Sequence, residues 1–227
     1  MNNEPRNIVL VHGAFADASS WLEVIVLLHN RGFHVTGVQI PLQSLEAGVA
    51  ATLRVLDAQY GPTVLVGHSY GGTVVSEAGT HSKVAVLVYV AALAPEPGEE
   101  FGELSARFTS TPGMADLRVV GGLVQFDEAG FIFNVAHDVA PDRARMAAAV
   151  QNPIAPDLLS QRTTQAAWKE KPTYYAISTQ DRVISPDLQR FLAKRMGARA
   201  IELNSSHASL ISHAAEVAEL IASAALS

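Results

Sequence analysis

Short apolar runs alternate with longer stretches of helical spacing through the first part of the chain. Four runs have the composition of strands that are buried on both faces of a sheet: 8–11, 35–40, 63–66 and 84–92. Three intervening stretches have helical spacing, capping residues or helix-ending glycines: 18–31, 44–60 and 72–82. Because strand and helix alternate, we predict an α/β fold with a mostly parallel central sheet flanked by helices.

The alternation stops after Ala94 and resumes near residue 163. The segment 95–162 is rich in proline and glycine and has only short helical patterns. After it, a helix over 163–168 is expected first, and then strand, helix, strand and helix in turn: 173–177, 186–196, 198–203 and 208–225. We therefore predict a core of 1–94 and 163–227 with an inserted, mainly helical lid over 95–162. Several apolar side chains of this segment either line a cavity or form the lid's own core: Met114, Leu117, Phe126, Phe131, Phe133 and Met146.

Composition narrows the class of protein. Of the 227 residues, 48% are hydrophobic and 17% charged, which favours a folded domain over disorder. The net charge of −6 and the lack of a Lys/Arg block argue against a nucleic-acid or membrane partner. The chain has no cysteine, no secretion-signal pattern and no apolar run long enough to span a bilayer, so a cytoplasmic location is expected. We see no metal-ligand spacing and no glycine-rich phosphate loop, so we expect no metal site.

A candidate nucleophile follows the third apolar run. Residues 67–71 read Gly-His-Ser-Tyr-Gly, the G-x-S-x-G pattern at a strand end with a predicted helix behind it. Small residues two positions before and two positions after Ser69, Gly67 and Gly71, allow the sharp turn that holds a serine hydroxyl out of the backbone. The pattern alone is common, so its position after a buried strand is the stronger evidence that Ser69 is a nucleophile.

Two further residues complete a possible triad. Asp181 and His207 each lie just beyond a predicted strand, in the chain order serine, acid, histidine. The carboxyl ends of parallel strands meet at one edge of the sheet, so the three side chains are expected to converge there. In that arrangement Ser69 attacks, His207 transfers the proton and Asp181 holds the imidazole. Four other acids compete with Asp181 for its role: Asp187, Glu96, Glu99 and Glu100.

An anionic intermediate would need hydrogen-bond donors. We expect them to be the backbone N–H groups of Tyr70, directly after the serine, and of Ala14, in the loop after the first strand. Phe15 in the same loop and His137 in the lid are the predicted substrate contacts. His12 is expected to orient the turn, and the side chain of His68 to point away from the hydroxyl of Ser69.

These motifs resemble the α/β-hydrolase superfamily over nearly the whole chain. Residues 9–15, 67–72, Asp181 and His207 carry the likeness, and the branch with small esterases, plant hydroxynitrile lyases and methyl esterases is the most similar. The resemblance implies a lid over the site and no cofactor. In the lyases, a threonine and a lysine occupy the positions that are Gly13 and Ala208 here, so ester hydrolysis is favoured over cyanohydrin cleavage.

The sequence thus predicts a serine hydrolase that cleaves small carboxylic esters through an acyl-enzyme. Its expected partner is a small, uncharged or weakly charged ester, and activity is expected to fall when His207 becomes protonated. The alternatives are lactone, amide or carbon–carbon hydrolysis, perhydrolysis, a hydroxynitrile-lyase-like reaction, or a receptor-like protein that binds a small molecule. The oligomeric state stays open.

Overall fold

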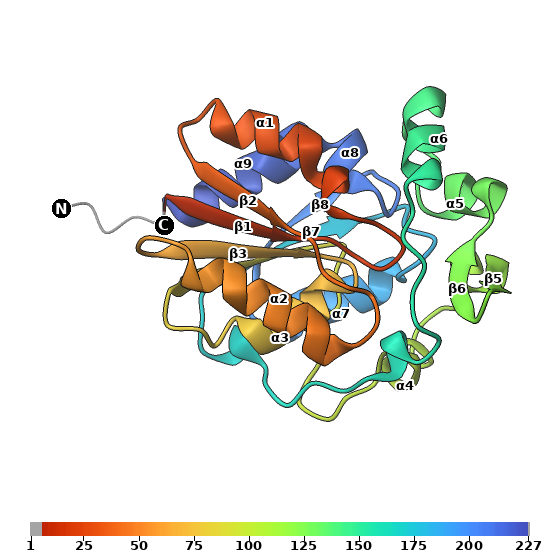
Figure 1. Cartoon of the computed structure of the whole chain (residues 1–227), viewed down its shortest axis with the longest axis horizontal. Coiled ribbons are helices and arrows are strands. Elements are labelled where there is room, and N and C mark those ends of the chain that lie inside the picture. Colours follow the sequence, from red (N-terminus) through yellow and green to blue (C-terminus); the bar gives the residue numbers. More distant parts are fainter. Residues whose placement is uncertain (1–5, 227) are drawn as a thin grey trace.

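Six parallel strands form the central sheet of the computed structural model, which describes residues 6–226. Their order in space is β2-β1-β3-β4-β7-β8. The strands are β1 Asn7–Val11, β2 His34–Val38, β3 Thr63–His68, β4 Val84–Val90, β7 Thr173–Ser178 and β8 Arg199–Leu203. The predicted fold class is confirmed, and because all six strands point the same way, their carboxyl ends share one edge of the sheet (Figure 1).

Helices cover both faces of this sheet (Figure 1). On one face lie α1 Leu22–His29, α8 Ser209–Ser212 and α9 Ala214–Ala225, and on the other α2 Leu45–Asp57, α3 Gly71–Ala78 and α7 Pro186–Arg195. Alternate strand residues feed two separate cores: Ile8 and Leu10 pack on the α1/α9 side, Val9 and Val11 on the α2/α3 side. Burial of both faces explains why the inner strands β1, β3 and β4 are rich in apolar residues, whereas the edge strands β2 and β8 are partly exposed and carry polar residues.

The segment between β4 and β7 lies beyond the carboxyl ends of the strands (Figure 1). It contains helices α4 Phe101–Ser105, α5 Glu128–Asn134 and α6 Pro141–Ala149, and an antiparallel hairpin of β5 Leu117–Val120 and β6 Leu123–Phe126. Short 3-10 turns at Pro112–Asp116, Leu158–Ser160 and Ala167–Lys169 complete it, and a further 3-10 turn, Ala18–Trp21, directly precedes α1. The sequence prediction did not include the hairpin.

Two predicted helices differ from those observed. The helix expected over 163–168 is wrong: only a 3-10 turn at Ala167–Lys169 forms, because the backbone N–H groups of Thr164 and Gln165 donate to the carboxylate of Glu77. The helix expected over 208–225 is split into α8 and α9 at His213, whose ψ of 39° interrupts it. Within 6–226, none of the helices combines the length and the apolar character that crossing a membrane requires.

Candidate active site

Ser69 sits on a strained turn between β3 and α3. Its φ of 52° is in the left-handed region, which a non-glycine residue adopts only when its surroundings impose it. The turn is fixed on both sides, because Ser69 N–H donates to the carbonyl of Val90 and Leu93 N–H donates to the carbonyl of Ser69. Gly71 must be small, since a Cβ there would lie 2.6 Å from the carbonyl oxygen of His12. Strand β1 therefore leaves no room for a side chain at the start of α3.

His207 and Asp181 are in direct contact. Nδ1 of His207 lies 2.7 Å from Oδ2 of Asp181, and both side chains are buried. The other carboxylate oxygen accepts from the backbone N–H groups of Val183 and Ile184, and Oδ2 also accepts from Nε2 of Gln189. These three donors fix the carboxylate of Asp181 in place. It therefore orients the imidazole with Nδ1 as the protonated nitrogen and leaves Nε2 free.

The backbone on either side of His207 is held by the segment between β4 and β7. Ser206 N–H donates to the carboxylate of Asp138 at 2.9 Å, and Ala208 N–H donates to the carbonyl of Val135 at 3.0 Å. Partial burial acts to raise the pKa of Asp138, but hydrogen bonds from Ser206 and Ser212 outweigh it and hold that pKa below its ordinary value. The residues after α5 therefore position the loop that carries His207.

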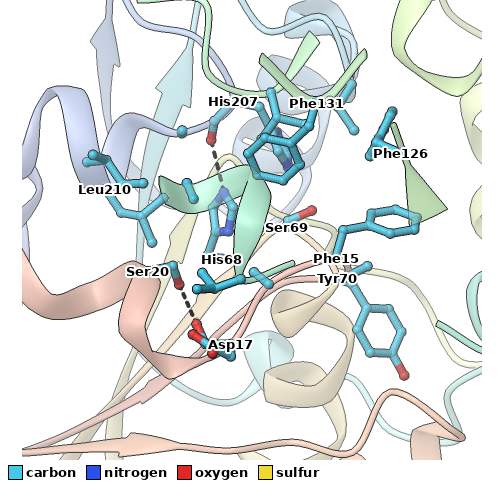
Figure 2. A pocket seen from close by; sticks show the side chains of 18 of the residues that line it. Phe15, Asp17, Ser20, His68, Ser69, Tyr70, Phe126, Phe131, His207 and Leu210 are labelled. Atoms are coloured by element: carbon cyan, nitrogen blue, oxygen red, sulfur yellow. Dashed lines mark hydrogen bonds between the residues drawn. The ribbon is translucent and has the colours of Figure 1, made fainter. Parts of the chain in front are cut away.

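His68 makes the third contact to this loop, and sequence reasoning missed it. Its Nε2 donates to the carbonyl of His207 at 2.9 Å, and the two rings lie 4.7 Å apart (Figure 2). Burial, and secondly the neighbouring His207, hold the pKa of His68 well below its ordinary value, so the ring is neutral. No sequence signal links residues 139 positions apart. The expectation that His68 merely points away from Ser69 did not anticipate this role.

The two predicted oxyanion donors face the same cavity as Ser69. Ala14 and Tyr70 both line it, and neither backbone N–H donates a hydrogen bond within the described part of the chain. His12 shapes the loop before Ala14, because its Nε2 accepts from Ile40 N–H and its Nδ1 then donates to the carbonyl of Gly13. The loop is thus fixed by a neutral histidine, as the sequence led us to expect.

A cavity of about 500 Å³ opens above Ser69. Its lining is predominantly apolar, and the hydroxyl of Ser69 points between the rings of Phe15 and Phe131 (Figure 2). That hydroxyl makes no hydrogen bond to the His207 ring among residues 6–226, although both residues line the cavity. At the rim, Arg143 of α6 forms an ion pair with Glu23 of α1. A neutral, apolar ligand suits such a lining.

The predicted substrate contacts fall into two groups. Phe15 lines the cavity, as do four of the apolar residues of 95–162 singled out from the sequence: Met114, Phe126, Phe131 and Met146. Leu117 instead borders a separate surface pocket, and Phe133 is 56% exposed with the guanidinium of Arg182 over its ring. His137 is not among the lining residues, so a substrate contact through it stays a prediction without support.

The competing acids have other partners. Asp187 pairs with Arg190, Glu99 with Arg195, Glu96 with Lys169, and Glu100 with Arg162. Of the five acids considered, Asp181 alone contacts His207 among the interactions of residues 6–226. The same part of the chain contains no cluster of three or more His, Cys, Asp or Glu side chains suited to a metal ion.

The fold and site geometry agree with one family. A family model described as the alpha/beta hydrolase family matches residues 8–220, which is nearly the whole chain. The chain belongs to the alpha/beta hydrolase family.

Individual relatives are distant but extend over most of the chain. An alpha/beta hydrolase of Aspergillus novofumigatus is 26% identical over 96% of both chains, and methylesterase 2 of Arabidopsis thaliana is 25% identical over 85% of both. Among solved structures, polyneuridine aldehyde esterase superposes with a TM-score of 0.83 at 18% identity, covering 97% of this chain and 99% of that one. A pyrethroid hydrolase from Sphingobium faniae also reaches 0.83, at 23% identity and 97% coverage of both. These structural likenesses show the shared fold.

Proposed function

We propose that the protein is a serine hydrolase of small carboxylic esters, with Ser69, His207 and Asp181 as its triad. The observation that carries the proposal is the 2.7 Å contact between His207 and Asp181 beside a serine held at a φ of 52°. A strained, cavity-facing serine next to an oriented imidazole has the parts that nucleophilic acyl transfer requires. Relatives whose names are methylesterase, pyrethroid hydrolase and esterase support ester cleavage.

The reaction runs in two halves. A rotation of the Ser69 side chain brings its hydroxyl to Nε2 of His207, which takes the proton as Oγ bonds to the ester carbon. The carbonyl electrons move to oxygen, where the N–H groups of Ala14 and Tyr70 stabilise the charge. The carbonyl re-forms, the carbon–oxygen bond to the alcohol breaks, and His207 returns the proton to that alcohol. Water repeats the sequence, which releases the acid and restores Ser69.

The cavity favours a neutral substrate with an apolar arm. Its lining is mostly apolar, and the cation at its rim, Arg143, is already paired with Glu23. We propose that the segment 95–162 acts as the lid, because it supplies Phe126, Phe131 and Met146 to the cavity wall. Strongly anionic substrates would find no unpaired cation among the cavity residues that the structure describes.

Hydrolysis of short-chain 4-nitrophenyl esters tests the proposal. Ser69→Ala is expected to lower kcat by at least about a thousandfold, because the variant has no nucleophile. Ser223→Ala, an exposed serine on α9, is the matched control and should retain wild-type rates. Equal turnover by wild type and Ser69→Ala would refute the assignment.

A further inference from the structure

The hydroxyl of Tyr70 has no part in the proposed chemistry, which uses only the backbone of this residue. Tyr70 is 3% exposed, and its Oη has no hydrogen-bond partner within residues 6–226. A buried hydroxyl without a partner is energetically unfavourable, so such groups are rare in folded proteins. Burial also raises the pKa of Tyr70 well above its ordinary value, so its hydroxyl keeps its proton near neutral pH and can donate a hydrogen bond.

The ring of Tyr70 runs from the active-site cavity to a second, smaller one. In Figure 2 it extends away from Ser69, with the hydroxyl at its far end. Tyr70 lines both cavities, and Leu93, Phe101 and Leu159 are the other residues that the two share. The second cavity holds about 10 Å³, roughly the space of one oxygen-sized group. The smaller cavity therefore continues the substrate cavity beyond Ser69 and ends beside the hydroxyl of Tyr70.

The surroundings of the smaller cavity select an uncharged acceptor. Glu99 borders it, and its carboxylate is already held by the guanidinium of Arg195. None of its described lining residues is a lysine or arginine that could receive an anion. Its remaining polar lining residues are Thr73 and Gln161, and the amide of Gln161 is engaged by Leu45 N–H and Asp157. A carboxylate would be repelled by Glu99, whereas a ketone, ether or hydroxyl oxygen would satisfy Tyr70.

We propose that the Tyr70 hydroxyl is a specificity determinant that hydrogen-bonds a neutral oxygen atom carried on one arm of the ester substrate. The inference rests on the proposed function and narrows it: the preferred substrates are esters whose apolar arm bears a carbonyl, ether or hydroxyl group several carbons from the scissile bond. Plain aliphatic esters would leave the donor unpaired and would react less efficiently.

Matched pairs of esters test this. One member carries a keto group and the other a methylene, with the keto position moved one carbon at a time, first along the acyl arm and then along the alcohol arm. Wild type is expected to prefer the keto ester by about tenfold in kcat/KM at one position. Tyr70→Phe should bring that ratio to about one, and Tyr60→Phe, which changes a tyrosine 95% exposed, should leave it unaltered.

The possible results separate the two proposals. Absence of a preference at every position in wild type, or a preference that survives in Tyr70→Phe, would overturn the role of the hydroxyl while ester hydrolysis still stood. Failure to cleave any ester of either series in a Ser69-dependent way would overturn the proposed function itself. The wild-type comparison needs no variant, so it remains decisive even if Tyr70→Phe folds poorly.

Discussion

Three non-glycine residues with positive φ lie beyond the ends of three strands, and two of them, Phe15 and Ser69, line the cavity. Phe15 has a φ of 59°, Ser69 of 52° and Ala91 of 43°. They come after β1, β3 and β4, the adjacent strands at the centre of the sheet. Such conformations each cost about 1–3 kcal/mol and persist only where neighbouring structure imposes them. At the residue scale, backbone strain is concentrated at Ser69, the proposed nucleophile, at Phe15 in the cavity wall and at the turn that follows β4.

Gly13 gives the sharpest prediction at this scale. A Cβ at this position would lie 2.8 Å from the Cβ of Ser69, which is closer than real Cβ atoms approach. Gly13→Ala should therefore displace the nucleophile and lower kcat/KM for a 4-nitrophenyl ester by about a hundredfold or more. Gly102→Ala in α4 is the matched control, since its Cβ would meet only the flexible carboxylate of Glu100 at 3.3 Å. Wild-type activity in Gly13→Ala would show that the loop and the serine are not tightly packed.

At the element scale, the segment that forms the cavity wall also supports the loop of His207. Asp138 and Val135 follow α5, and they bind the backbone on both sides of that histidine. The residues after α5 and the loop of His207 are thus joined by hydrogen bonds. If the proposed function holds, a change in these residues should alter the rate as well as the affinity for substrate.

Asp138→Asn tests this coupling. The amide replaces an ionised acceptor of two donors, Ser206 N–H and Ser212 Oγ, so we expect a loss of about 1–3 kcal/mol in the free energy of unfolding and about a tenfold lower kcat. Asp142→Asn, at an exposed carboxylate of α6, should change neither. If kcat is unaltered while the stability falls, the contact is structural and does not position His207.

The same variant has a defined pH dependence. The folded-state pKa of Asp138 is lowered, so its ionised form stabilises the fold fully above the unfolded value of about 3.9, and the contribution is lost as pH falls through the lower folded pKa. The difference in unfolding free energy between wild type and Asp138→Asn should therefore shrink in acid. A difference in unfolding free energy that stays constant down to low pH would contradict the lowered pKa of Asp138. Urea denaturation in a series of buffers measures this.

The elements differ in how far sequence could predict them. Strands buried on both faces are continuous apolar runs, so the central sheet could be predicted from the sequence. The β5–β6 hairpin was overlooked although Gly121-Gly122 between two apolar pairs is a hairpin signal, and both glycines have positive φ. The contact of His68 with His207 depends on tertiary packing and could not be read from local pattern.

At the scale of the whole molecule, the parallel sheet gathers distant parts of the chain at one edge. Ser69, Asp181 and His207 were predicted to converge because each follows a strand. The structure brings Asp181 and His207 into contact, and Ser69 and His207 both line the cavity. The residues of 95–162 that line the cavity were only partly predictable, since irregular segments lack a periodic pattern that fixes which side faces inward.

Buried neutral histidines make the fold sensitive to acid. Burial lowers the pKa of both His68 and His12, so the unfolded chain binds protons that the folded one does not. The unfolding free energy should fall as pH drops below about 6.5, by up to about 1.4 kcal/mol per pH unit for each such histidine. His68→Gln should reduce that slope between about pH 5 and pH 7, as followed by urea denaturation. An unchanged slope would show that His68 is protonated in the folded protein.

Covalent labelling tests the central claim most directly. A fluorophosphonate reacts with a serine only when a neighbouring base activates it, so intact-mass and peptide analysis should find one adduct, on Ser69. The labelling rate should fall by at least about a hundredfold in His207→Ala. An adduct at another residue, or equal labelling of wild type and His207→Ala, would contradict the assignment of Ser69 as a nucleophile activated by His207 and Asp181.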